Sequence, residues 1–204
     1  HGMRYLTLGS LFLDFPGHDT PTEYYRDLNL ENATSTTRYE IDGVKLVRTT
    51  FASFTDDVII VRIQADKAKA LNFSISYGGP QNSQVQVKNG KLIVSCQGAE
   101  HEGIPAAMRA ECQVQVKTDG KVGKETQALA VNGATEATLY ISAATNFVNY
   151  KDVSANESKR AAAYLKNAIR TPYEQALKNH ITHYRKQYDR VALNLESSEI
   201  SALE

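Results

Sequence analysis

Four Asn-Gly or Asp-Gly pairs constrain the fold of this chain more than any other feature: Asp42-Gly43, Asn89-Gly90, Asp119-Gly120 and Asn132-Gly133. Both residues of such a pair tolerate the positive φ angles that two-residue hairpin turns require. The first pair separates Tyr39–Ile41 from Val44–Leu46, and the second separates Val85–Lys88 from Lys91–Val94. A further turn is expected after Val116. These pairs predict β-hairpins, and therefore neighbouring strands that run antiparallel.

Apolar residues alternate with polar ones along the segments between these turns. Residues 71–77 carry Leu, Phe, Ile and Tyr at every second position, and Leu11, Leu13 and Phe15 repeat the pattern. A period of two with one apolar face is typical of a sheet that packs on one side. We therefore predict a mainly β protein, with an antiparallel β-sandwich from about Tyr5 to Thr145.

The apolar period changes from two to that of a helix near Ser154. The segment Ser154-Ala155-Asn156-Glu157 has the sequence of a capping box, in which Ser154 caps the helix and Glu157 reaches back. A second start follows at Thr171, where Pro172 occupies a position that needs no N–H. Two helices are predicted, at about Ala155–Ile169 and Pro172–Tyr188.

Beyond the second helix, Val191–Leu195 returns to alternation and predicts a short strand, whereas residues 196–204 are polar and predicted to fray. The chain therefore divides into a sandwich domain at residues 1–150 and a helical linker with a short strand at residues 151–204. The linker stripe of Leu177, Ile181, Tyr184 and Tyr188 is more apolar than an exposed helix tolerates. We expect part of it to pack on the sandwich and part to face a partner, so self-association is expected where that partner is missing.

Charge and apolar length exclude two classes of partner. The 204 residues contain 23 basic and 23 acidic side chains, so no general field attracts nucleic acid or an anionic membrane surface. No apolar run, including the one at Val58–Val61, approaches the length of about 20 residues that a membrane helix needs.

Cysteine and histidine spacing gives no metal site. Cys96 and Cys112 flank one loop and are either bridged or two free thiols, and two cysteines make no structural zinc site unaided. His180 and His183 share one helical face but lack the glutamate of a zinc-protease motif. A packed His180 and an exposed His183 are predicted, with no cofactor and no metal.

The stretch from Tyr24 to Ile63 carries a specific family resemblance. It contains Tyr-Arg-Asp-Leu-Asn-Leu-Glu-Asn-Ala at Tyr25–Ala33, followed by Asp-Gly-Val at Asp42–Val44 and Phe-Ala-Ser at Phe51–Ser53. Together with segments near Thr7–Leu11, Ala143–Phe147 and Asp189–Leu193, this pattern resembles the alpha-L-fucosidase group of glycoside hydrolases, family ninety-five. The resemblance covers nearly the whole chain.

The resemblance implies a β-super-sandwich, then linker helices, then an (α/α)6 catalytic barrel. The resemblance also implies that the chain starts part-way through the sandwich, which predicts an exposed sheet edge. It further implies that the chain stops before the barrel, which carries the catalytic carboxylates. No residue of this chain is predicted to be catalytic. The implied role is to support and orient the barrel of an inverting hydrolase that acts on α-L-fucosyl or related L-galactosyl glycans. A periplasmic or secreted location is also implied.

The loop between Cys96 and Cys112 contains the only candidate site residues. His101 and Glu102 pair an imidazole with a carboxylate and resemble a loop segment of the family. Two interpretations remain open: the loop leans over the barrel mouth and touches sugar, or it is a solvated or interdomain loop.

A stand-alone carbohydrate-binding module is the alternative function, since β-sandwiches often host one. Sugars stack on flat aromatic rings, and this chain has 11 Tyr but no Trp. Because most of these tyrosines fall in strand or helix patterns that predict packing, the enzyme-domain interpretation is preferred. Oligosaccharide binding without turnover would favour the alternative.

Overall fold

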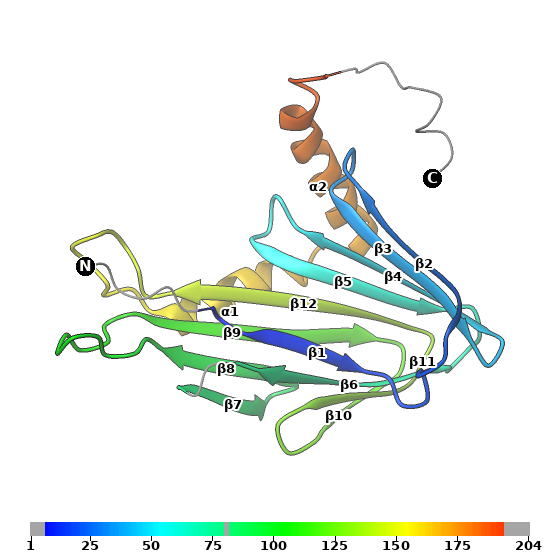
Figure 1. Ribbon diagram of the computed structural model, residues 1–204, viewed down its shortest axis with the longest axis horizontal. Coiled ribbons are helices and arrows are strands. Elements are labelled where there is room, and N and C mark those ends of the chain that lie inside the picture. Colours follow the sequence, from blue (N-terminus) through cyan, green and yellow to red (C-terminus); the bar gives the residue numbers. More distant parts are fainter. Residues whose placement is uncertain (1–6, 80–81, 194–204) are drawn as a thin grey trace.

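Two antiparallel sheets and two helices make up the computed structural model, which describes residues 7–79 and 82–193 (Figure 1). The larger sheet holds, in spatial order, β2 (Thr22–Asn29), β3 (Thr34–Ile41), β4 (Val44–Ala52), β5 (Val58–Ala65), β12 (Glu136–Thr145), β9 (Arg109–Thr118), β8 (Lys91–Gln97) and β7 (Ser83–Lys88). The smaller sheet holds β1 (Ser10–Asp14), β6 (Leu71–Gly78), β11 (Leu129–Ala134) and β10 (Lys121–Lys124). The helices are α1 (Glu157–Ala168) and α2 (Tyr173–Tyr188). The predicted mainly β sandwich followed by two helices is confirmed.

The first two Gly-containing pairs form the hairpin turns that the sequence predicts. Asp42 and Gly43 have φ angles of 51° and 69°, and Asn89 and Gly90 have 52° and 69°. Positive φ at both central residues defines the turn whose twist matches that of the flanking strands. These turns join β3 to β4 and β7 to β8.

The other two pairs lie where the chain changes sheets. Asp119-Gly120 connects β9 of the larger sheet to β10 of the smaller one. Gly133, with φ of 62°, lies within β11, where the register against β6 shifts between Val131 and Ala134. A β-bulge of this kind bends a strand, and β12 follows in the larger sheet. The same dipeptide chemistry therefore serves a bulge as well as hairpins.

The main core lies between the two sheets. Strand β6 contributes Leu71, Phe73 and Ile75, which are at most 3% exposed, and β12 contributes Ala137 and Leu139 from the opposite sheet. These residues occupy alternate positions along their strands, as a sandwich requires.

A second core covers the outer face of the larger sheet. Phe51, Ile60 and Tyr140 pack there against Leu165 of α1 and Ala176 of α2, all at most 2% exposed. The central strands are therefore covered on both faces, which explains why the neighbouring residues Ile60 and Val61 are both buried, whereas Ile59 is 44% exposed. Figure 1 shows α1 behind β12 and α2 behind the raised end of the larger sheet.

The predicted cap of the first helix is wrong by two residues. Asn156 is the N-cap, and its Oδ1 accepts a hydrogen bond from the Lys159 amide at 2.7 Å. Ser154 instead belongs to a preceding turn, in which its amide donates to Asp152 Oδ1 at 2.8 Å. Asn caps a helix as well as Ser does, and the Asp152 turn fixes Ser154 outside the helix.

The second helix starts next to Pro172 as predicted, although no side chain caps it. The predicted short strand is not found at Val191–Leu193, and its remaining residues, Asn194 and Leu195, lie outside the described residues. Over the described ranges, neither helix is long and apolar enough to cross a bilayer.

Within the same ranges β1 pairs only with β6, so the other edge of β1 is unpaired.

Candidate functional site

One histidine joins α2 to two separate segments of the sandwich. The His180 side chain is 2% exposed, and its Nδ1 accepts a hydrogen bond from the Phe54 amide at 3.2 Å. Its Nε2 lies 3.1 Å from the Asn32 carbonyl and 3.2 Å from the Ala33 carbonyl. Since Nδ1 accepts, Nε2 carries the proton and donates, so the ring is a neutral imidazole with both nitrogens used. The predicted packed His180 is confirmed.

The carbonyls that His180 contacts belong to the family-like motif at Tyr25–Ala33. This motif forms β2 and the turn into β3, where Asn29 Oδ1 accepts from the Asn32 amide at 3.0 Å and Ala33 has a φ of 49°. Tyr184 adds a hydrogen bond from its hydroxyl to the Leu30 carbonyl at 2.7 Å. The motif therefore presents three backbone carbonyls that fix the position of α2.

Aromatic rings extend this anchor along α2. The centre of the His180 ring lies 4.9 Å from that of Phe51 in the sheet and 6.2 Å from that of Tyr184, which stacks on Tyr188 at 5.4 Å. This row of rings runs from the buried Phe51 to Tyr188, which is 40% exposed at the end of the helix. Most of the helix is thus held on its own sandwich.

The apolar stripe of α2 is mostly half-buried. Leu177, Ile181 and Tyr184 are half-buried, and only Tyr188 of that stripe is exposed. Around it lie the exposed Leu30 and Phe54, the latter 6.4 Å from Tyr184 between ring centres. We call Leu30, Phe54 and Tyr188 the hairpin-tip patch. Part of the stripe therefore packs on the sandwich as expected, whereas contact of the exposed part with a partner and self-association stay predictions.

His101 and Glu102 lie on the turn of the β8–β9 loop. Glu102 and Gly103 have φ angles of 52° and 79°, and His101 and Ile104 exchange two backbone hydrogen bonds of 3.2 and 3.0 Å across them. His101 Nε2 lies 4.0 Å from Glu102 Oε1, with the Glu side chain 62% exposed. The structure brings the predicted pair together on this turn, and both interpretations of the loop stay predictions.

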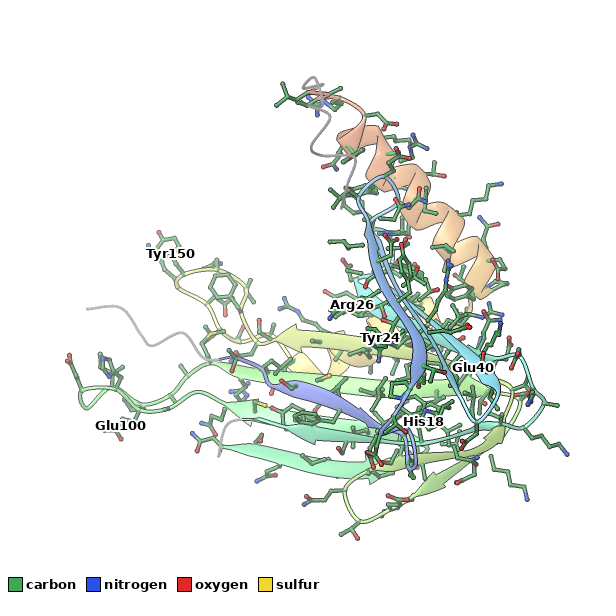
Figure 2. All side chains as sticks on the ribbon, turned by 45° about the vertical axis from the view of Figure 1, so that its right-hand side comes forward. His18, Tyr24, Arg26, Glu40, Glu100 and Tyr150 are labelled. Carbon is green, nitrogen blue, oxygen red and sulfur yellow. The ribbon has the colours of Figure 1, made fainter. Side chains whose placement is uncertain are left out.

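The β8–β9 loop shares its base with the loop between β12 and α1. Asn146 is fully buried and donates from Nδ2 to the Ala107 and Val153 carbonyls at 2.9 and 2.8 Å, while its Oδ1 accepts from the Arg109 amide at 2.8 Å. Figure 2 shows Glu100 and Tyr150 on these two loops, at the end of the sandwich away from α2. Tyr150, 86% exposed, is an aromatic side chain that strand and helix patterns did not reveal.

Both cysteines are free thiols. Cys112 is buried, and this burial, reinforced by Cys96 and Glu111 nearby, raises its pKa to about 11. The Sγ of Cys96 lies 3.5 Å from the Tyr77 hydroxyl, whose pKa burial raises to about 12. A protonated thiol is a poor nucleophile and metal ligand. Across residues 7–79 and 82–193, no three His, Cys, Asp or Glu side chains lie close enough together to hold a metal ion.

An antiparallel two-sheet sandwich with helices on its outer face is the fold of an N-terminal domain of glycoside hydrolases. The sequence model of the family "Glycosyl hydrolase family 65, N-terminal domain" matches residues 1–150. The chain therefore belongs to this family. Among solved structures, the putative kojibiose phosphorylase from human microbiome superimposes with a TM-score of 0.57 over 86% of this chain. At 10% sequence identity, that likeness shows the fold alone.

A curated relative is closer in sequence. The chain is 27% identical to "Alpha-L-fucosidase 2" of Arabidopsis thaliana over 227 aligned residues, which cover 95% of this chain. It spans 26% of the length of that relative and 25% of the phosphorylase chain.

Proposed function

We propose that residues 1–204 form a non-catalytic domain that supports and orients the helical catalytic barrel of an α-L-fucosidase-type hydrolase of family ninety-five. The observation that carries this proposal is the similarity to alpha-L-fucosidase 2, which extends over 95% of the chain but only 26% of the relative. In this proposal the barrel and its carboxylates belong to the part of a longer protein that the alignment leaves uncovered.

The anchoring of α2 supports an orienting role. A domain that positions another needs a rigid connection, and His180 and Tyr184 fix α2 to the motif hairpin through contacts of 2.7 to 3.2 Å with its carbonyl oxygens. The hairpin-tip patch of Leu30, Phe54 and Tyr188 then provides an exposed apolar surface beside the end of that helix. Exposed apolar patches of this kind commonly mark interfaces.

Hydrolysis of an aryl α-L-fucoside tests the proposal. We expect no turnover by residues 1–204 alone, and release of L-fucose with inversion by the complete protein encoded by the natural reading frame. Turnover by the 204-residue chain, abolished by a substitution within it, contradicts the proposal. A complete protein that ends near Glu204 contradicts it as well.

The finer assignments are part of the same proposal. His101 and Glu102 approach the substrate if the β8–β9 loop faces the barrel mouth, and His101→Ala in the complete enzyme then raises KM with little change in kcat. An unchanged KM would mean that His101 and Glu102 belong to an ordinary solvated turn.

A periplasmic or secreted location likewise belongs to the proposal, and fractionation of the source cells checks it.

A carbohydrate-binding module is the second candidate, and exposed aromatic rings favour it. Tyr24, Tyr25 and Tyr150 are 58%, 52% and 86% exposed, and sugars stack on such rings. Calorimetric titration of the 204-residue chain with fucosylated and xyloglucan-type oligosaccharides measures this function. Saturable binding without turnover, in a protein with no helical barrel, would establish it over the enzyme-domain proposal.

A further inference from the structure

A cleft of about 720 Å³ lies on the outer face of the larger sheet, beside the turn that joins α1 to α2. Its floor is one row of side chains, because Arg62 of β5, Thr138 of β12 and Lys117 of β9 are paired across three neighbouring strands. Tyr173 and Glu174, at the start of α2, form part of its wall. The sequence patterns did not reveal this site, since its residues are far apart along the chain.

The Arg62 side chain is fixed before any ligand arrives. Its guanidinium donates to Glu174 at 3.0 Å and to Glu136 at 2.8 Å, and it lies 4.4 Å from the centre of the Tyr173 ring. The side chain is 16% exposed, and its Nε is a buried nitrogen for which the described residues supply no hydrogen-bond partner. The Arg62 side chain is therefore preorganised in the floor of the cleft.

The charges that line the cleft exclude two ligand classes. Asp119, Glu136 and Glu174 outnumber the cations Arg62 and Lys117, so a phosphate or other anion meets net repulsion. Two of these carboxylates bind Arg62, and the third accepts hydrogen bonds from the Thr135 and Glu136 amides. Among the described residues, no three His, Cys, Asp or Glu side chains lie close enough together here to hold a metal ion. The lining instead mixes donors, acceptors and an aromatic ring.

Such a mixture matches a polyhydroxylated neutral ligand, because each hydroxyl both donates and accepts a hydrogen bond. We propose that this cleft binds one pyranose unit of a neutral oligosaccharide. The Lys117 ammonium donates to the Ile169 carbonyl and has further N–H donors for hydroxyl oxygens. Thr138 also donates to a hydroxyl oxygen, and Glu136 and Glu174 accept from hydroxyl groups through the oxygen atoms that Arg62 leaves free. A cleft of several hundred Å³ is large enough for such a ligand. The site goes beyond the proposed function, because it needs no catalytic barrel.

Titration of the 204-residue chain, followed by amide chemical shifts in nitrogen-15 NMR spectra, tests the site. The probes are methyl α-L-fucopyranoside and methyl α-D-glucopyranoside, added up to about 50 mM because single sugar units bind with millimolar affinity. We expect saturable shifts at Thr118, Glu136 and Tyr173 and none at Glu102. Inorganic phosphate and methyl glucuronoside, which are anionic, should bind more weakly than the neutral sugars.

Two variants separate a binding role from a structural one. Thr138→Val removes a hydroxyl while keeping the shape. Lys117→Met removes the ammonium of an exposed side chain, together with its hydrogen bond to the Ile169 carbonyl at the end of α1. Each should weaken sugar binding about two- to tenfold, the effect of one hydrogen bond, without lowering the unfolding temperature by more than a few degrees. Lys151→Met, on the β12–α1 loop, is the matched control and should bind like the unchanged chain.

Three results would overturn the site: no saturable shift with either sugar, phosphate binding tighter than the sugars, or unchanged affinity in both variants. The outcome is distinguishable from that of the proposed function. If the complete protein is a fucosidase but residues 1–204 bind no sugar, only the cleft proposal is wrong. If the chain binds sugar in the cleft but the complete protein has no barrel, only the enzyme proposal is wrong.

Discussion

At the scale of single residues, His180 determines how the linker helix meets the sandwich. One imidazole accepts from the Phe54 amide and donates to the Asn32 and Ala33 carbonyls, so it joins a helix, a β4–β5 turn and a β2–β3 turn. An aliphatic side chain would fill the space but leave these backbone groups without partners. The residue is therefore needed for its two nitrogens rather than for its volume.

We predict that His180→Phe lowers the free energy of unfolding by about 1 to 3 kcal/mol, because it leaves the partly buried Phe54 amide and the Asn32 and Ala33 carbonyls without this partner. His183→Phe is the matched control, because His183 is exposed on the same helix and should change stability by no more than about 0.5 kcal/mol. Urea unfolding followed by circular dichroism measures both. Equal losses in the two variants would show that the anchor contributes nothing of its own.

The packed state of His180 was predictable, but its partners were not. An apolar helical stripe indicates which side chains face inward, and this argument placed His180 inside and His183 outside. The Asn32 and Phe54 groups that it contacts lie more than 120 positions away in the sequence, and no local pattern links them. The residues of the Arg62 cleft escaped prediction for the same reason.

At the scale of elements, α1 is fixed at its start by a cap and by an ion pair. Asn156 caps the helix, and Arg109 of β9 contacts Glu157 with 2.9 Å between Nε and Oε1. Both contacts involve the first turn, where the helix dipole also favours a carboxylate.

Replacing the cap distinguishes the observed helix start from the predicted one. Asn156→Ala should cost about 1 kcal/mol, because the Lys159 amide loses its acceptor. Ser154→Ala should cost less than about 0.5 kcal/mol, since Ser154 lies in the preceding turn. Thermal unfolding of the two variants measures the difference, and a larger loss for Ser154→Ala would restore the capping box.

The ion pair makes the docking of α1 depend on pH. The hydrogen bond from Arg109 lowers the pKa of Glu157 below its ordinary value of 4.5, so the folded state binds fewer protons than the unfolded state in this range. The resulting stabilisation is present above pH 4.5 and is lost as pH falls through the lowered pKa.

We predict that Glu157→Gln flattens the fall in stability below pH 4.5, measured by urea unfolding across that range. Glu100→Gln, on the exposed β8–β9 loop, should leave the slope unchanged. If both variants keep the original slope, Glu157 is not the group that responds.

Element types were predictable because hairpin turns and helical periods are local signals. The turns at Gly43 and Gly90 have the positive φ angles that their sequences require. By contrast, the Asn132-Gly133 sequence alone does not distinguish the bulge from a hairpin, because the same dipeptide forms a hairpin turn at Asn89-Gly90. Which sheet receives the next strand depends on packing between sheets, and packing is a property of the whole molecule.

At the scale of the whole molecule, the larger sheet is shared between two cores. One core lies against the smaller sheet and the other against α1 and α2. The family model ends at residue 150, before either helix begins, and the predicted division at the same point remains a prediction. Physically, however, a sandwich cut there has an uncovered apolar face.

Removing residues 151–204 should therefore destabilise the sandwich itself. Phe51, Ile60 and Tyr140 are at most 2% exposed, and their outer face is covered by α1 and α2. Each buried side chain of this size contributes about 1.5 to 3 kcal/mol, so losing this cover removes an amount comparable with the 5 to 15 kcal/mol net stability of a typical domain.

We expect residues 1–150 alone to aggregate or to bind a hydrophobic dye strongly, whereas residues 1–204 remain compact. Size-exclusion chromatography and dye fluorescence measure this, with urea unfolding of any soluble fraction. Phe51→Ser in the 204-residue chain is a milder version of the same change and should lower stability without removing a helix. A monodisperse 1–150 fragment with cooperative unfolding would mean that the helices serve only a partner domain, because the sheet would then be stable without their cover.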